Sequence, residues 1–295
     1  MGTKENRDIP AILPVKSDLI FRLLFADERN KEELLCLLKA ILQIPEDDYD
    51  EIEIADPHLL PEYIEDKYAI IDVKLYTKSK KIVHIEIQLK ITPELRKRII
   101  FYNSKLITEQ IGSGGNYAEI QNVISIIILE KNLITESPKY HHCFRFYDSE
   151  SHIELTDLVE VHTIELDKLP VITDGSQLYD WAKFINAETE EELTMIADRN
   201  QYVEKAVVKL HRLSSDEQTR YFYEMREKAR RDIESQERWA RIEGQEEGRK
   251  EGRREGENRL SKLNTILLKD KRYDLLEKIS NDENFRNEMY SKYDL

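Results

Sequence analysis

The 295-residue sequence has no long apolar run and only two cysteines. Its longest purely apolar stretches, such as residues 126–129, fall far short of the roughly 20 residues that a membrane-spanning helix needs. The first ten residues lack the apolar segment of a signal peptide, so we expect a cytoplasmic protein with no membrane anchor. Cys36 and Cys143 are too few for a disulfide framework and lack zinc-binding spacing, which fits a reducing compartment.

An excess of positive charge is also missing. The formal net charge is -14, and residues 1–225 hold 27 Lys and Arg against 42 Asp and Glu. An acidic surface repels DNA unless a local basic surface or bound cations reverse the field. The composition therefore excludes a broadly basic nucleic-acid-binding protein, and a DNA partner would have to bind at a local exception.

The hydrophobic pattern predicts an α/β fold with a central mixed sheet flanked by helices, because short β-rich segments alternate with amphipathic ones. Residues 123–129 are apolar and β-branched, which is typical of a central strand covered on both faces. Asn30 and Glu33 resemble a capping box. The predicted helices are residues 19–24, 34–42 and 92–112, and the predicted strands are residues 52–54, 68–77, 82–89, 123–129, 140–147 and 153–166.

The C-terminal third is predicted to be helical, because no glycine or proline occurs between Ser176 and Gly244. Glycine then recurs every fourth residue from Gly244 to Gly256 among charged residues. This segment is either a solvated helical linker or a helix whose glycine edge lets another helix approach; the latter favours a homo-oligomer formed through the C-terminal helices. The expected divisions are residues 1–175, 176–240, 241–259 and 260–295.

Two carboxylates on neighbouring predicted strands are candidates for a metal site. Asp72 and Glu86 flank the predicted turn at residues 78–81, so antiparallel pairing would bring them together. Carboxylates that share a small space favour a divalent cation such as Mg²⁺, which can activate water for phosphodiester hydrolysis. Gln88 and Lys90 follow on the same predicted face, where they would orient the water and stabilise a charged oxygen. The alternative is an exposed, half-solvated hairpin without a site.

Basic residues cluster directly after Glu86. Arg96, Lys97, Arg98 and Lys105 form the densest basic group of the acidic part, and they would hold phosphates if their helix flanks the site. The run of residues 141–143, two histidines and a cysteine, does not predict a transition-metal site, because adjacent strand residues point to opposite faces and a fourth ligand is missing.

The order of these elements resembles the PD-(D/E)XK nuclease superfamily, which has a restriction-endonuclease-like core. More closely, the chain resembles the Rpn family of recombination-promoting nucleases, also described as transposases of the PD-(D/E)XK type. No single motif is specific, but the ordered set is, over roughly residues 15–260. The segments that carry the resemblance are SDLIFRLLFADERNKEELLCLLKAIL, DKYAIIDVKLYT, VHIEIQLK, RKRIIFYNSKL and the Glu-Gly repeats near the C-terminus.

The resemblance implies roles for individual residues. Asp72 and Glu86 become metal ligands, with the backbone carbonyl of Ile87 as a third, and Asp18 matches an acidic position that opens the family's first helix. Asp18 is equally well explained as a helix N-cap.

Gln88 occupies the place of the superfamily's lysine, so the source of positive charge stays open between Lys90 and Lys74. The implied function is a Mg²⁺-dependent DNA endonuclease in recombination or transposition-like DNA processing. The alternative is a catalytically inactive nuclease-fold module that mediates protein assembly.

Overall fold

The computed structural model describes residues 11–42, 52–55 and 73–295. The chain divides into two compact units, Met1–Glu224 and Met225–Leu295. The first unit contains all the strands of the described residues together with helices α1 to α6, and the second is helical.

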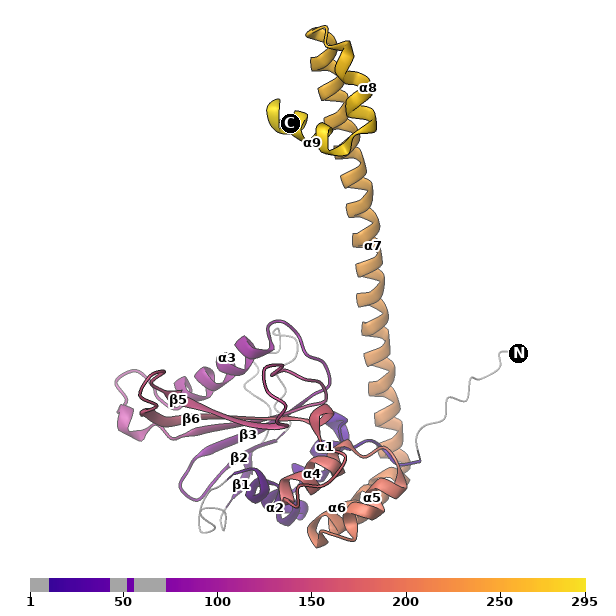
Figure 1. Ribbon diagram of the computed structural model, residues 1–295. Coiled ribbons are helices and arrows are strands. Elements are labelled where there is room, and N and C mark those ends of the chain that lie inside the picture. Colours follow the sequence, from indigo (N-terminus) through magenta and orange to yellow (C-terminus); the bar gives the residue numbers. More distant parts are fainter. Residues whose placement is uncertain (1–10, 43–51, 56–72) are drawn as a thin grey trace, which may run out of the picture. The chain divides into compact units, whose positions relative to one another are not determined.

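A six-stranded mixed sheet lies at the centre of the first unit, within the described part of the chain. The strand order is β1-β2-β3-β4-β6-β5; β3, β4 and β6 are parallel to one another, while β1, β2 and β5 join by antiparallel pairing. This arrangement confirms the predicted α/β fold (Figure 1). The strands are β1 (Glu53–Ala55), β2 (Val73–Tyr76), β3 (Ile82–Gln88), β4 (Val123–Leu129), β5 (His141–Tyr147) and β6 (Glu154–Glu165).

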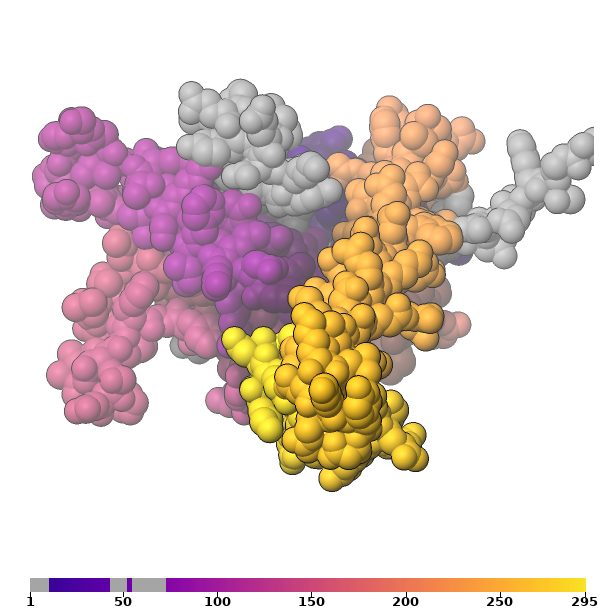
Figure 2. Space-filling view, turned by 90° about the horizontal axis from the view of Figure 1, so that it is seen from above, coloured from indigo at the N-terminus to yellow at the C-terminus, as the bar shows by residue number. Residues whose placement is uncertain are grey.

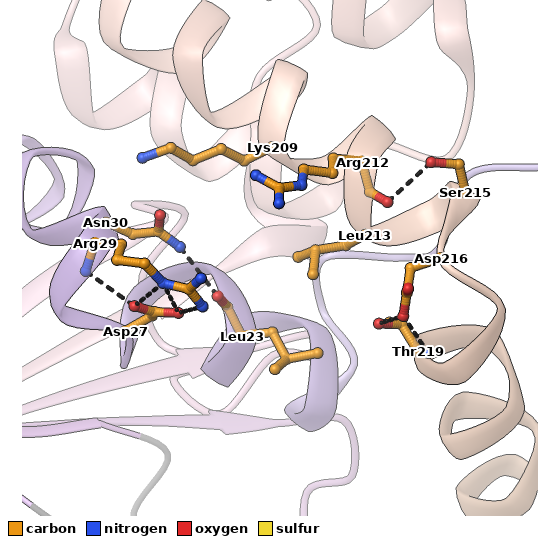
Figure 3. Close-up of a pocket in the computed structure, with 10 residues that line it drawn as sticks. All are labelled: Leu23, Asp27, Arg29, Asn30, Lys209, Arg212, Leu213, Ser215, Asp216 and Thr219. Atoms are coloured by element: carbon orange, nitrogen blue, oxygen red, sulfur yellow. Dashed lines mark hydrogen bonds and ion pairs between the residues drawn. The ribbon is translucent and has the colours of Figure 1, made fainter.

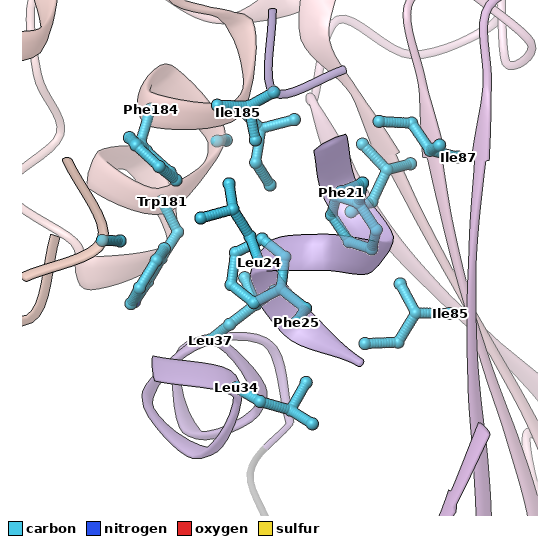
Figure 4. Packing of buried hydrophobic residues seen from close by; sticks show 14 of the residues in the cluster. Phe21, Leu24, Phe25, Leu34, Leu37, Ile85, Ile87, Trp181, Phe184 and Ile185 are labelled. Atoms are coloured by element: carbon cyan, nitrogen blue, oxygen red, sulfur yellow. The ribbon is translucent and has the colours of Figure 1, made fainter. Parts of the chain in front are cut away.

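One face of the sheet is covered by the helices that precede and follow it in the sequence. Phe21 and Phe25 of α1 contact each other, and Phe25 meets the edge of Trp181 from α4 at a centroid distance of 5.9 Å (Figure 4). These rings pack over Ile85 and Ile87 of β3, while α5 and α6 pack against α1, α2 and α4 from outside. The helices are α1 (Asp18–Phe25), α2 (Lys31–Ile41), α4 (Gln177–Asn186), α5 (Glu190–Ala197) and α6 (Gln201–Ser215).

Helix α3 (Leu95–Thr108) covers the opposite face. Leu95 and Ile99 pack on Ile127 of β4 and on Val161 of β6. The outer side of α3, purple in Figure 2, forms part of the molecular surface seen from above. All seven residues of β4 are buried, which confirms the predicted central strand. Strand β4 pairs in parallel with both of its neighbours. Parallel sheets are covered on both faces, and this covering accounts for the complete burial of β4.

Two predicted helix starts differ from the structure. Asn30 does not cap α2; its side-chain amide donates to the carbonyl of Leu23 at 3.1 Å, because a short 3-10 turn (Glu28–Asn30) runs directly into the helix. Helix α3 begins at Leu95, behind Glu94, instead of at residue 92. It ends at Thr108 instead of Gly112.

The second unit holds most of the long helix α7 (Glu217–Lys269), followed by α8 (Tyr273–Asn281) and α9 (Glu283–Lys292). A small core joins α7 to the last two helices through Leu263, Leu267, Ile279 and Met289. Helix α7 runs without a break through the four periodic glycines, and a Cβ added at any of them would meet nothing within 4 Å. None of the described helices has a segment long and apolar enough to cross a membrane.

Candidate active site on strand β3

Strand β3 carries two polar side chains into the space beneath α3. Alternation sends Val83, Ile85 and Ile87 into the core formed with α1, α2 and α4, so His84 and Glu86 face α3. Both are buried, with exposed fractions of 1% for His84 and 6% for Glu86. The alternative of a half-solvated hairpin at Glu86 is therefore wrong, because β3 is an inner strand covered on both faces.

The carboxylate of Glu86 is held by two donors. The amide of Gln88 donates to Oε1 of Glu86, and Nη2 of Arg98 donates to the same oxygen at 3.1 Å. Burial raises the pKa of Glu86, and the Arg98 charge and the Gln88 hydrogen bond oppose that rise only in part. Among the described residues, Arg98 and Gln88 thus offset the burial of ionised Glu86 only in part, and a further cation would stabilise it.

The basic side chains of α3 point to different places. Arg98 points inward to Glu86, and its Nε is buried without a hydrogen-bond partner among the described residues. Arg96 donates to the carbonyl of Leu133 at 2.8 Å, toward the loop after β4. Lys97 is exposed and Lys105 is half-buried. The cluster therefore supplies one cation to Glu86 and others to the surrounding surface.

The remaining predicted cations differ in their placement. Lys74 of β2 lies opposite His84, so it stands on the face that carries Glu86. Strand β3 ends at Gln88, and Lys90 lies in an exposed bend beyond it, so the predicted strand face does not extend to Lys90. Asp18 is exposed at the start of α1.

Two of the predicted metal ligands, Asp72 and the backbone carbonyl of Ile87, can be judged only from the residues next to them. Asp72 lies outside the described residues, directly before Val73 in the sequence. Val73 pairs with Ile85, the residue before Glu86. The carbonyl of Gln88 points toward β4, where it accepts the amide of Glu130 at 3.0 Å. Because peptide groups alternate in direction along a strand, the Ile87 carbonyl points away from β4.

A buried polar network next to Glu86 was not predicted. The imidazole of His84 contacts the hydroxyl of Ser125, which donates to Oδ1 of Asn103 at 2.7 Å, and Asn103 donates to the Ile99 carbonyl. Burial lowers the pKa of His84 to about 4, with a smaller contribution from the Lys74 charge, so its ring is neutral at pH 7. The available sequence signal was Ser125, the single polar residue of an otherwise apolar strand.

A separate cavity of about 610 Å³ lies between the end of α1 and the junction of α6 with α7 (Figure 3). Two of its three cations are matched by carboxylates. Arg29 pairs with Asp27, and Lys209 pairs with Glu33 at 2.6 Å.

One comparison with known proteins identifies a family for the chain. Residues 15–240 match the family model of PD-(D/E)XK nuclease family transposases. The chain belongs to this family. No curated protein and no solved structure matches it. The matched range includes the whole sheet, α3 and the helices that cover the other face, so the Glu86 site lies within the nuclease-family part of the chain.

Replacing Glu86 by glutamine tests the energetic cost of the buried carboxylate. Burial raises the folded-state pKa above the ordinary 4.5, so the folded chain holds this proton more tightly than the unfolded chain. The contribution to stability is present below pH 4.5 and is lost as the pH rises through the raised pKa. In EDTA, Glu86→Gln is therefore expected to be more stable than the wild type at neutral pH, and this advantage should vanish in acid.

Urea unfolding at a series of pH values measures this difference. Glu119→Gln is the matched control, because Glu119 is an exposed carboxylate whose replacement should change stability by no more than about 0.5 kcal/mol. Equal stability of the wild type and Glu86→Gln at every pH would contradict the assignment.

Proposed function

We propose that this protein is a Mg²⁺-dependent DNA endonuclease that acts in the cytoplasm in recombination or transposition-like DNA processing. The observation that carries the proposal is the buried, incompletely compensated carboxylate of Glu86 on an inner strand of a PD-(D/E)XK nuclease-family chain. Burial of such a group costs stability, and enzymes accept this cost where the group binds a metal ion or takes part in catalysis.

The chain offers the hard oxygen ligands that Mg²⁺ prefers. The proposed ligands are the carboxylates of Glu86 and Asp72 and the backbone carbonyl of Ile87, with Asp18 as a further candidate. Support for Asp72 comes from its position next to Val73, and support for Ile87 comes from a carbonyl that points away from β4. A bound Mg²⁺ would lower the pKa of a water molecule and offset charge on the phosphate.

Side chains of the protein would position the Glu86 carboxylate and the attacking water. Gln88 holds Oε1 of Glu86 and presents an amide that can orient the attacking water. Arg98 holds the carboxylate from α3 and partly opposes the rise in its pKa that burial causes. Lys90 and Lys74 are the candidates for stabilising the leaving oxygen of the phosphodiester. Lys74 is supported by its position, because it lies on the same sheet face as Glu86.

Nicking of supercoiled plasmid tests the proposed reaction. The wild type is expected to nick in Mg²⁺ and not in EDTA. Asp72→Asn and Glu86→Gln each remove a ligand charge while keeping the side-chain shape, so each is expected to lower the rate by about 100-fold or more. Glu119→Gln should retain wild-type activity.

Two outcomes would contradict the proposal in different ways. Nicking that survives Glu86→Gln would exclude this site but leave a nuclease elsewhere in the chain. A wild type that cleaves neither plasmid nor linear DNA with Mg²⁺ at low salt would favour the inactive assembly module.

We further propose that the surface of α3 contacts DNA phosphates through Arg96, Lys97, Arg98 and Lys105. Lys97 is the residue to test, because it is exposed, whereas Arg98 pairs with Glu86 and Arg96 with Leu133. Lys97→Ala is expected to weaken duplex binding and to reduce the slope of log K against log salt by about 0.9, the value for one lost phosphate contact.

Fluorescence anisotropy in EDTA measures this slope without cleavage. Lys205→Ala is the matched control, because Lys205 lies on α6 at the other face of the sheet and pairs with Glu32 at 2.8 Å. An unchanged slope in Lys97→Ala would remove α3 from the DNA-binding surface.

We also propose that copies of the chain associate through the C-terminal helices, which would serve either the nuclease or an assembly module. Helix α7 exposes Trp239 to 67% and carries a glycine edge on which nothing in the described residues packs. Removal of residues 240–295, and separately Trp239→Ala, is expected to lower the number of chains per particle, which is the molar mass from light scattering divided by the mass of one chain. Met195→Ala, which alters an equally exposed side chain on α5, should leave it unchanged. The same number of chains per particle in all four proteins would exclude association through α7.

A further inference from the structure

Strands β5 and β6 hold a second group of metal-binding side chains. Cys143, Glu160 and His162 offer a thiol, a carboxylate and an imidazole whose ligand atoms all lie within 4.8 Å of one another. Antiparallel pairing places Cys143 directly opposite His162, and Glu160 stands two residues before His162 on the same face. The sequence did not indicate this group, because its ligands come from two strands instead of from the run at residues 141–143.

Both β6 side chains already have outer partners of the kind that surround metal ligands. Nδ1 of His162 lies 2.9 Å from Nε2 of His141, so His162 can donate there while its Nε2 binds a metal. Arg145 donates to Oε2 of Glu160, and Oε1 of Glu160 forms a hydrogen bond with Nε2 of His162, where a metal ion would replace the shared proton. Such outer hydrogen bonds fix the tautomer and orientation of metal ligands.

We propose that Cys143, Glu160 and His162 bind one Zn²⁺ or a similar divalent transition-metal ion, with water in the fourth position. Thiolate and imidazole ligands select zinc and its neighbours, whereas Mg²⁺ takes oxygen ligands. The zinc site is separate from the Glu86 site. His162 pairs with Ile126, which belongs to the core on the side of α1 and α2, while Glu86 faces α3.

Metal binding at this position is coupled to loss of the thiol proton. The metal must therefore displace the proton to solvent, so its affinity should increase with pH. The zinc site would also cross-link β5, the edge strand, to β6 next to an irregularity in their pairing between Phe144 and Tyr147.

Cobalt provides a direct probe, because a Co²⁺-thiolate bond produces charge-transfer absorption. Titration of the full-length, metal-free protein with Co²⁺ is expected to give this band with one equivalent, and added Zn²⁺ should remove it. Cys143→Ser is expected to abolish the band. Cys36→Ser is the matched control and should keep it, since Cys36 lies on α2 and burial raises the pKa of its thiol to about 11.

Further variants separate a metal site from a hydrogen-bonded cluster. His141→Phe preserves an aromatic ring beside His162 but removes the acceptor, and it is expected to weaken Co²⁺ binding by about 10 to 100-fold. Glu160→Gln should weaken it at least as much. Glu86→Gln should leave the band unchanged, so failure of the nuclease proposal would not affect this result. Absence of the band in the wild type, its persistence in Cys143→Ser or its loss in Cys36→Ser would overturn the proposal.

Discussion

Parallel pairing of β3, β4 and β6 is the constraint on which the rest of the first unit depends. Strands of this kind are stable only when both faces are covered, so helices must pack on each side of the sheet. Helices α1, α2 and α4 cover one face, and α3 covers the other. Glu86 stands on the α3 face, so the packing that completes the fold also removes its carboxylate from water.

The packing of α3 also supplies part of the positive charge that offsets the burial of Glu86. Helix α3 places hydrophobic residues on β4 and β6 while Arg98, on the same helix, reaches Glu86. One cation and one amide do not cancel the effect of burial, and the pKa of Glu86 stays raised. Positive charge among the described neighbours of Glu86 thus offsets its burial only in part, which is the basis of the proposed divalent-ion site.

Part of the acidity of residues 1–225 is explained by ion pairs inside the fold. Several carboxylates in this part pair with cations inside the fold, as Glu33 pairs with Lys209 and Asp180 with Arg199. The basic residues of α3 are divided between Glu86, the loop after β4 and the open surface. A polyanion would therefore meet a small basic area instead of a broad one, and its binding would depend strongly on salt and metal.

The sequence by itself determined the fold class, the central position of β4 and the helical C-terminal third, and it made Glu86 a candidate site residue. These follow from local periodicity, from apolar runs and from an ordered set of motifs. Each of these signals can be recognised within a single segment of the chain. Element ends were less secure: Asn30 was assigned as a cap although its amide binds Leu23.

Only the tertiary structure decided which polar groups meet across strands and helices. The burial of Glu86, its contact with Arg98 and the network of His84, Ser125 and Asn103 depend on β3, β4 and α3 packing together. The group of Cys143, Glu160 and His162 depends on the register of β5 and β6. Such contacts join residues far apart in sequence, and their energies depend on desolvation, which exists only once the layers have packed.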